Sequence, residues 1–398
     1  MQSETAIRRY VAALGNANDI STWSGIPYHF SMAGVRAQFF TGALELPTRN
    51  LGSRRMAWNL ARVLSGDRRG GYQYSRSCLR FLYGFVRETL FDSEVISHFQ
   101  LFPPAAEAGR TGTRFGHYID MPLSRLFDEY GIANTIGRRI ARDAVKREVE
   151  NYSAAHLVVC MSSWAARAVV TEYDVDEAKV KVVLPGANMS ETAIESRTKD
   201  LDAAPIISEF SVARPFRIGF TGRDPYRKGL PRLIKAAAIL KDRGYPVEVS
   251  IIGICPEEFR NEPVVREIGM IQKRTEMDRF IDTVMSMDLG CLLSDAEGLG
   301  ISTLEFLRVG VPVMGTEVGG ITDCIPKRAG LLLPERPDPE DVAARVQELL
   351  DNPVKYEAMR REARAIRRHY SWDRTVKEFA LLWSNKEAST RFESGRSS

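Results

Sequence analysis

Short apolar runs alternate with stretches of helical periodicity along most of the chain, and the alternation is most regular in the second half. Four runs there are each followed by glycine or serine, a loop and helical spacing: 216–221, 247–252, 289–293 and 311–314. Runs of this length predict buried strands. Strands alternating with helices predict an α/β fold with parallel, doubly wound sheets. Such sheets bind ligands beyond the carboxyl ends of their strands, where the loops after the first, third and fourth runs should lie.

The first half shows the same alternation in a less regular form. Its apolar runs, which predict further strands, are 9–14, 92–99, 156–161 and 180–184. A turn-rich loop over 15–25 precedes a helix that should open near Pro27, and Ser162 and Ser163 precede another at 164–173. Periodicity fades between about 187 and 214. We therefore predict domains over 1–200 and 201–372, followed by a crossover helix and a polar tail over 373–398.

The composition narrows the class of protein. A chain of 398 residues is too long for one ordinary core, and 44% hydrophobic with 27% charged residues is typical of a soluble globular protein. The five cysteines are scattered and form no C-x-x-C pair, which favours a reducing compartment over a zinc site or a disulfide framework. The first residues lack the apolar segment of a signal peptide, and no apolar run is long enough to span a membrane. We expect a cytoplasmic protein whose membrane contacts, if any, are peripheral.

One stretch is strongly basic. Between residues 49 and 87 the only acid is Asp67, and aromatic residues are interleaved with nine arginines: Arg49, Arg54, Arg55, Arg62, Arg68, Arg69, Arg76, Arg80 and Arg87. A solvated helical face is one interpretation. A surface that docks onto an anionic membrane carrying a lipid acceptor is a second, since such membranes attract basic segments by about 1 kcal/mol per cation. Nucleic acid is the least favoured partner, because no nucleic-acid-binding motif accompanies the charge.

Two carboxylates flank a glycine turn where a helix should begin. Glu297 precedes the turn and Glu305 lies eight positions later, inside the expected helix. The free backbone N–H groups at a helix start bind phosphate, and carboxylates accept hydrogen bonds from sugar hydroxyls. The arrangement therefore predicts a site for a nucleotide sugar.

Several motifs together resemble a known family. They are the G-R-x-x-x-x-K-G turn from Gly222 to Gly229, the E-x7-E pair, the glycines Gly319 and Gly320, and the segments 330–334, 341–350 and 370–372. They resemble the retaining glycosyltransferases of family 4, whose GT-B fold consists of two Rossmann-like, doubly wound domains facing across a cleft. In the first half, segments 23–27, 162–167 and 185–188 look like a branch of the same family.

The resemblance implies roles around the donor. Arg223 and Lys228 would bridge the diphosphate, with Arg227 as the alternative arginine because the family's spacing is often one residue longer. Glu297 would bind the transferred sugar and Glu305 the ribose. Backbone N–H groups for the diphosphate or sugar would come from Gly298, Leu299, Gly300, Ile301 and Ser302.

Glycines would complete the donor side. Gly222 opens the basic turn, and the resemblance places Gly319 and Gly320 close to the donor, although a bare Gly-Gly turn is an equally good interpretation. In the first half, Gly25 corresponds to a loop glycine that lines the family's cleft.

The acceptor side has two candidates. Family members commonly carry a histidine in the first domain, and the local candidates are His117 and Asp120. Ile119 stands where the histidine is usual, so Asp120 is slightly favoured over His117. A lone histidine beside aromatic residues is more often structural.

The implied reaction is a transfer with retention that requires neither a metal nor a cofactor. The acceptor would be a glycan or a lipid-linked sugar in cell-envelope or polysaccharide synthesis. A nucleotide-sugar epimerase of the same fold remains an alternative, as does a sugar phosphorylase, which would need a lysine carrying pyridoxal phosphate. A non-catalytic sugar-binding partner is the alternative from another class of protein.

Overall fold

The computed structural model describes residues 7–64, 66 and 70–384, and the chain divides into two compact units. The first comprises Met1–Leu184 and Thr375–Ser398, and the second comprises Pro185–Arg374. The predicted domains divide after residue 200, whereas the units divide after residue 184, so helix α9 (Glu191–Thr198) lies in the second unit. The predicted polar tail, from residue 385 onward, lies outside the described residues.

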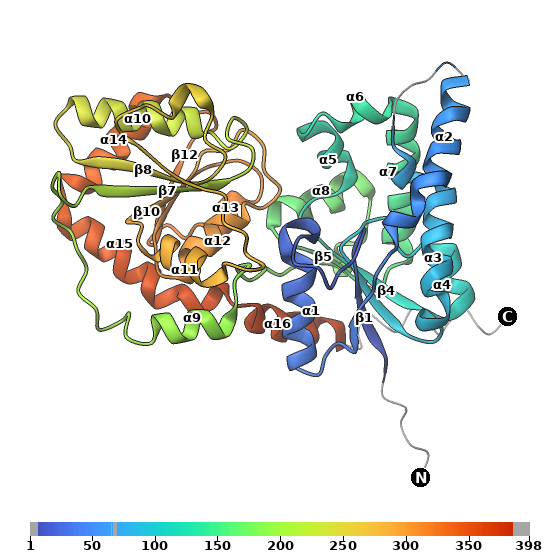
Figure 1. Ribbon diagram of the computed structural model, residues 1–398. Helices are drawn as coiled ribbons and strands as arrows, with labels where there is room; N and C mark the ends of the chain where they lie inside the picture. Colours follow the sequence, from blue (N-terminus) through green and yellow to red (C-terminus); the bar gives the residue numbers. More distant parts are fainter. Residues whose placement is uncertain (1–6, 65, 67–69, 385–398) are drawn as a thin grey trace, which may run out of the picture. The chain divides into compact units, whose positions relative to one another are not determined.

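A parallel six-stranded sheet forms the centre of the first unit, with the order β2-β1-β3-β4-β5-β6 (Figure 1). Its strands are β1 (Arg9–Ala12), β2 (Gly42–Ala43), β3 (Glu94–Ser97), β4 (Arg114–Ile119), β5 (Val158–Cys160) and β6 (Val180–Val182). Its helices are α1 (Ile26–Arg36), α2 (Gly52–Leu64), α3 (Arg76–Leu90), α4 (Ala105–Thr111), α5 (Leu123–Glu129), α6 (Ile132–Ile136), α7 (Arg138–Ala154) and α8 (Ser163–Tyr173). Every residue of β3 and β5 is buried, as expected for a parallel sheet covered on both faces.

Local sequence signals position two helices of this unit. Pro27 lies in the first turn of α1, where its missing N–H has no helical partner to lose. The hydroxyl of Ser162 accepts the N–H of Ala165 at 3.2 Å and caps α8. Both predicted helix starts are confirmed. The last helix, α16 (Trp372–Ser384), begins at the end of the second unit and continues into the first from Thr375.

The second unit contains a second parallel six-stranded sheet, with the order β12-β11-β10-β7-β8-β9 (Figure 1). Its strands are β7 (Phe216–Gly222), β8 (Val247–Gly253), β9 (Val265–Gly269), β10 (Leu289–Leu292), β11 (Val313–Thr316) and β12 (Gly330–Leu333). Its helices after α9 are α10 (Leu230–Asp242), α11 (Met277–Met285), α12 (Ile301–Arg308), α13 (Ile321–Cys324), α14 (Pro339–Leu350) and α15 (Pro353–Ile366). All four apolar runs predicted as strands in this half are strands.

The strand order determines which loops of the second unit meet. Strand β10 pairs with β7 on one side and with β11 on the other, all in parallel. The loops that follow these three strands therefore emerge next to one another at the carboxyl edge of the sheet. They carry Arg223, Glu297 and Gly319, as predicted.

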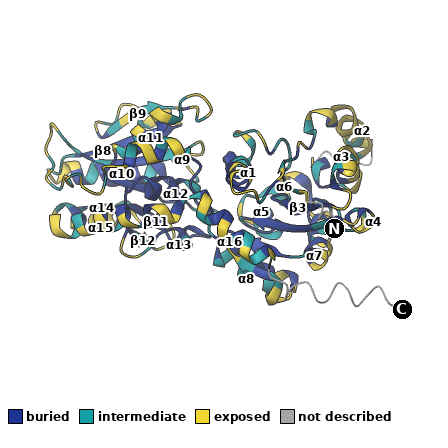
Figure 2. Cartoon of the chain, turned by 90° about the horizontal axis from the view of Figure 1, so that it is seen from below, coloured by how far each residue is buried: buried dark blue, intermediate teal, exposed yellow. Residues whose placement is uncertain are grey.

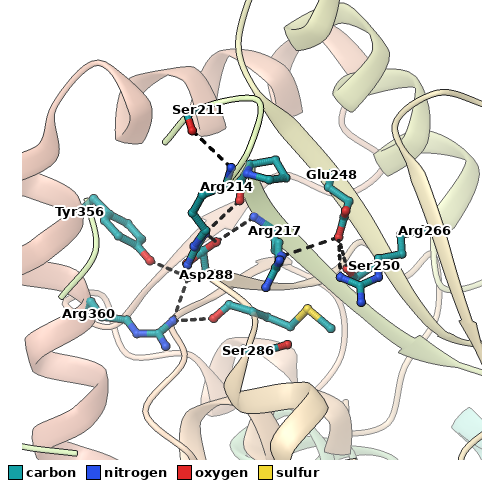
Figure 3. Close-up of polar contacts among 12 residues, drawn as sticks. Ser211, Arg214, Arg217, Glu248, Ser250, Arg266, Ser286, Asp288, Tyr356 and Arg360 are labelled. Atoms are coloured by element: carbon teal, nitrogen blue, oxygen red, sulfur yellow. Dashed lines mark hydrogen bonds and ion pairs between the residues drawn. The ribbon is translucent and has the colours of Figure 1, made fainter. Parts of the chain in front are cut away.

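The opposite, amino edge of this sheet is closed by a network around Asp288, the residue before β10 (Figure 3). Arg214 binds both carboxylate oxygens at 2.6 and 2.7 Å, and the backbone N–H of Arg217 donates to one of them at 2.8 Å. From α15, Tyr356 and Arg360 donate to the Asp288 carbonyl at 3.2 Å each. The network joins the starts of β7 and β10 to α15. Its charged side chains therefore hold these elements together.

Three further observations concern the described residues. All five cysteines are buried and form no disulfide. None of the helices there is long and apolar enough to cross a membrane. Within the same ranges, no group of three or more histidine, cysteine, aspartate or glutamate side chains is placed to hold a metal ion.

Candidate functional site

The loop after β7 brings two cations to the carboxyl edge of the second sheet. Gly222 ends the strand, and a Cβ atom at that position would lie 2.5 Å from the Lys228 side chain. A larger residue at this position would therefore require the lysine side chain to shift from the strand end. Arg227 and Lys228 are both largely buried, with side chains 24% and 13% exposed.

Both cations contact Glu297, which follows β10. One Glu297 oxygen, Oε2, lies 2.9 Å from Arg227 Nη1 and 3.5 Å from Lys228 Nζ, and it accepts the Ser294 hydroxyl at 3.2 Å. Burial alone would raise the pKa of Glu297, but Lys228, Arg227 and Ser294 together lower it below its ordinary value. Glu297 is therefore an ionised carboxylate beside two cations.

The structure selects Arg227, the alternative arginine, as the partner of Glu297. Its guanidinium also donates to the Ala296 carbonyl at 2.5 Å and to Asp224 at 3.2 Å. Arg223 lies exposed in the same loop. The sequence spacing alone leaves both arginines possible, because the arginine and the lysine of the family are often one residue further apart than Arg223 and Lys228.

The Gly319 and Gly320 turn packs directly against the loop of Glu297. Gly319 has a φ of +54°, and a Cβ atom there would lie 1.7 Å from the Glu297 carbonyl oxygen. The N–H of Gly320 donates to the Gly298 carbonyl at 3.1 Å. This turn therefore sets the position of the glutamate backbone, and a larger residue at 319 would displace it.

Helix α12 begins at the same place. Gly300 precedes its first residue with a left-handed backbone, so Ile301 and Ser302 form the first turn, where N–H groups lack helical partners. The predicted segment from Gly298 to Ser302 thus runs from beside Glu297 into the helix start. A diphosphate there would meet backbone donors as well as the two cations.

Glu305 lies in α12 and is almost completely buried, with a side chain 3% exposed. Its partner is the ammonium of Lys273, in the loop between β9 and α11, which also lies 4.2 Å over the Phe280 ring. Burial raises the pKa of Glu305, and Lys273 and Lys228 offset only part of that rise. The sequence reasoning missed Lys273, because nothing in its spacing separates it from neighbouring Arg274.

In the first unit, Gly25 lies buried directly before α1. Trp23 and Ser24 before it have φ values of +45° and +58°, a region that non-glycine residues rarely occupy. Such strain persists only where surrounding contacts hold it, and it clusters at functional sites. The predicted loop is thus a tightly held turn after β1.

The two acceptor-side candidates lie at different depths in β4. His117 is in the middle of the strand, fully buried, with its ring edge-on to Tyr152 at 5.3 Å. Burial lowers the pKa of His117 to about 3, so the ring is neutral. Asp120 follows the last residue of the strand and is half-buried. Of the two, Asp120 is the one at the carboxyl end of its strand.

Glu148 of α7, which the sequence reasoning also missed, fixes the segment after Asp120. Its two oxygens accept the Leu123 N–H at 3.0 Å and the hydroxyls of Tyr152 and Tyr173 at 2.5 Å each. Burial raises the pKa of Glu148 to about 8, against the lowering effect of these hydrogen bonds. It contacts the chain three residues beyond Asp120, at Leu123, and it holds the start of α5 in place.

A family model covers the part of the chain that carries the second-unit site. Residues 208–366 match the glycosyl transferases group 1. The D-inositol 3-phosphate glycosyltransferase of Corynebacterium urealyticum is 28% identical over 226 residues, or 53% of this chain and 52% of that protein. The 2-deoxystreptamine glucosyltransferase of Streptomyces kanamyceticus is 30% identical over 148 residues, or 34% of this chain and 37% of that protein. The chain thus spans about half the length of the first relative and less of the second.

Solved structures are similar over nearly the whole chain. Anabaena HepE in complex with UDP has a TM-score of 0.63 at 14% identity, covering 95% of this chain and 100% of that one. A UDP-forming trehalose-phosphate synthase of Burkholderia xenovorans has a TM-score of 0.66 at 12% identity, covering 95% and 99%. Likeness at this identity shows the fold. The predicted GT-B fold, with two Rossmann-like parallel sheets, is confirmed, and its second unit holds the region similar to the glycosyl transferases group 1.

Proposed function

We propose that the protein is a glycosyltransferase that moves a sugar from a nucleotide-sugar donor to a hydroxyl acceptor, with retention of configuration and without a metal. The observation that carries this proposal is the convergence of Arg227 and Lys228 on Glu297 beside the start of α12. Fixed cations and helix N–H groups suit a diphosphate, and a carboxylate beside them suits sugar hydroxyls. The match of residues 208–366 to the glycosyl transferases group 1 supports the same assignment.

The donor would exchange partners with groups that are already paired. Its diphosphate would take the guanidinium of Arg227 and the ammonium of Lys228, with the exposed Arg223 as a further cation in the same loop. Glu297, released from the cations, would accept hydrogen bonds from the transferred sugar. Glu305 would bind the ribose hydroxyls. The Lys273 ammonium beside it favours the ionised form of this buried carboxylate, against the effect of burial.

The chemical step would depend on stabilising the leaving group. As the bond between the sugar and the diphosphate breaks, negative charge grows on the diphosphate, where the two cations and the helix N–H groups are already oriented. The oxygen of the acceptor hydroxyl would then bond to the sugar carbon, on the same face that the diphosphate leaves. A diphosphate oxygen would take the proton of that hydroxyl. Lys228 and Arg227 supply charge that a metal supplies elsewhere, so we expect no metal or cofactor requirement.

For the donor and acceptor, the similar proteins suggest where to begin. HepE was solved with UDP and with UDP-glucose, which makes uridine the first base to test. The relatives are named for D-inositol 3-phosphate and 2-deoxystreptamine, both ring compounds rich in hydroxyls or amines. We propose a glycan or lipid-linked acceptor of cell-envelope or polysaccharide synthesis, with Asp120 on the acceptor side. We also propose that the protein belongs to glycosyltransferase family 4 and that it acts at the cytoplasmic face of the membrane.

The test is a panel of UDP-, GDP- and ADP-sugars, followed by thermal shift, calorimetry and donor hydrolysis with and without EDTA. We expect one base to bind, EDTA to have no effect, and the product anomer to match the donor by NMR. Lys228→Ala should weaken binding of the diphosphate, whereas Lys235→Ala, at an exposed lysine of α10, should not. Absence of binding to every donor would overturn the proposal, and conversion of the donor sugar without transfer would indicate an epimerase.

A further inference from the structure

Helix α2 of the first unit has one side that packs inward. Trp58 and Arg62 are its only half-buried residues, and its other residues are all exposed. The Trp58 ring lies 5.7 Å from the buried ring of Tyr72, and the Arg62 guanidinium lies 4.8 Å over the Trp58 ring. This packing face is aromatic and cationic instead of aliphatic.

The aliphatic residues of α2 lie on the other side, in solvent. Met56, Leu60, Val63 and Leu64 are 73%, 60%, 46% and 80% exposed. Their spacing of four, seven and eight positions from Met56 places them on a single helical stripe. Figure 2 shows α2 exposed along its length. A helix of a globular protein normally turns such a stripe to the core, so this one is oriented to meet something outside the unit.

Positive charge surrounds the stripe. The Arg54 guanidinium of α2 lies 4.1 Å over the Phe81 ring of α3, so the two helices are neighbours. Phe81 packs edge-on against Phe85, which is itself 52% exposed. The exposed arginines of the two helices are Arg54, Arg55, Arg76, Arg80 and Arg87. Arg80 contacts Glu107 at 3.5 Å, and Glu88 is the one exposed acid on these two helices.

We propose that α2, with the adjoining face of α3, is a docking surface for an anionic lipid bilayer. The stripe would enter the boundary between headgroups and acyl chains, and the arginines would bind the headgroup phosphates. A purely apolar partner would explain the stripe but not the excess of arginine around it. This surface lies wholly in the first unit, and lipid binding is measured without a donor, so the inference does not depend on the proposed function. The predicted Arg68 and Arg69 lie outside the described residues.

The test is flotation of the full chain with vesicles of phosphatidylcholine alone or of equal parts phosphatidylcholine and phosphatidylglycerol. We expect flotation with the anionic vesicles only, weakened by salt. Leu60→Glu should reduce the bound fraction by about tenfold, and Arg55→Glu by several-fold. Both side chains are exposed, so thermal unfolding should be unchanged. Val354→Glu, which alters an exposed valine of α15 that is 78% accessible, is the matched control and should float like the wild type.

Three results would overturn the proposal. The first is no flotation of the wild-type chain on anionic vesicles, and the second is equal flotation of the wild type and Leu60→Glu. The third is equal flotation on neutral and anionic vesicles, which would remove the role of the arginines. If light scattering instead shows a dimer that Leu60→Glu dissociates while no vesicle binds, the stripe is an interface between copies of this chain.

Discussion

Glu148 of the first unit and Glu297 of the second are both buried carboxylates near the carboxyl edge of a parallel sheet, yet their partners differ. Glu148 accepts from two tyrosine hydroxyls and a backbone N–H, all neutral donors, and burial raises its pKa to about 8. Glu297 lies beside Arg227 and Lys228, and its pKa is lowered. Neutral donors leave nothing to exchange with a charged ligand. The cations Arg227 and Lys228, in contrast, can exchange the Glu297 carboxylate for a charged ligand. The second site is therefore the one suited to a diphosphate.

The largest expected effect is the pH dependence that Glu148 gives to the free energy of unfolding. In the unfolded chain this group ionises from its ordinary value near 4.5, whereas in the folded protein it keeps its proton up to about pH 8. The folded state therefore binds more protons between these values, and the free energy of unfolding falls as pH rises. At about 1.4 kcal/mol per pH unit, the loss over this whole range reaches at most about 5 kcal/mol.

Urea unfolding at pH 5, 6.5 and 8 measures this loss. Glu148→Gln cannot ionise, so its unfolding free energy should change less over the same range, even if it is lower overall. Glu88→Gln, at an exposed glutamate of α3, is the control and should retain the wild-type slope. Equal slopes for the wild type and Glu148→Gln would mean that Glu148 is ionised in the folded protein, and the contrast with Glu297 would disappear.

The second prediction removes a cation from the Glu297 site. Lys228→Ala should lower turnover by about a hundred- to a thousandfold, the cost of losing one oriented group that stabilises charge in a transition state. The fold should survive, because Arg227 still neutralises Glu297. Steady-state kinetics with the donor identified by the panel would measure the effect, with Lys235→Ala as the control. A variant with near-normal turnover would make the ion pair a packing feature, like the Glu148 cluster.

The third prediction separates the two arginines of the loop. Arg227→Ala should reduce turnover by about a hundredfold, since its guanidinium is already held at the site, whereas loss of the exposed Arg223 should cost about tenfold or less. Kinetics of both single variants would rank them. The reverse ranking would show that the donor recruits Arg223 and that the Arg227 contact with Glu297 belongs to the ligand-free state.

Much of the fold could be predicted because its strands are buried on both faces. The runs that became β7, β8, β10 and β11 are predominantly apolar for this reason. Strand β9 was missed, since its sequence carries Arg266 and Glu267 at an exposed edge. Helix α7 was also missed: its apolar residues Ile140, Val145 and Val149 pack only partly against the core and are interspersed with many charged residues.

The part of the site that lies within one short stretch of sequence was predictable. The spacing of Glu297, the glycine turn and Glu305 reflects a helix start that the structure shows at Ile301. The choice between Arg223 and Arg227 depends on how one turn folds, which spacing does not define. Lys273 reaches Glu305 from a loop between other elements, and such a tertiary contact leaves no local pattern.

The fourth prediction concerns that contact. Lys273→Met should weaken nucleotide binding by about tenfold, because Glu305, already raised in pKa by burial, would lose its cation and take up a proton. Glu305→Gln should give a similar loss, and the double variant should be no worse than either single one. Calorimetry with the free nucleoside diphosphate measures this. Additive losses would show that the two residues bind different parts of the ligand.

The smallest expected effect is at His117, the acceptor-side candidate in the middle of β4. His117→Leu should change turnover by less than about threefold, or roughly 0.6 kcal/mol, since the ring lies in the core beside Tyr152. Asp120→Asn should change it far more. His117 has a folded pKa of about 3, so its neutral form favours folding above pH 6.5 and that stability is lost as pH falls. His117→Leu should therefore unfold less readily in acid than the wild type. A large loss of turnover with the fold intact would return His117 to the active site and would make the first unit's buried side chains, like the second unit's, part of the chemistry.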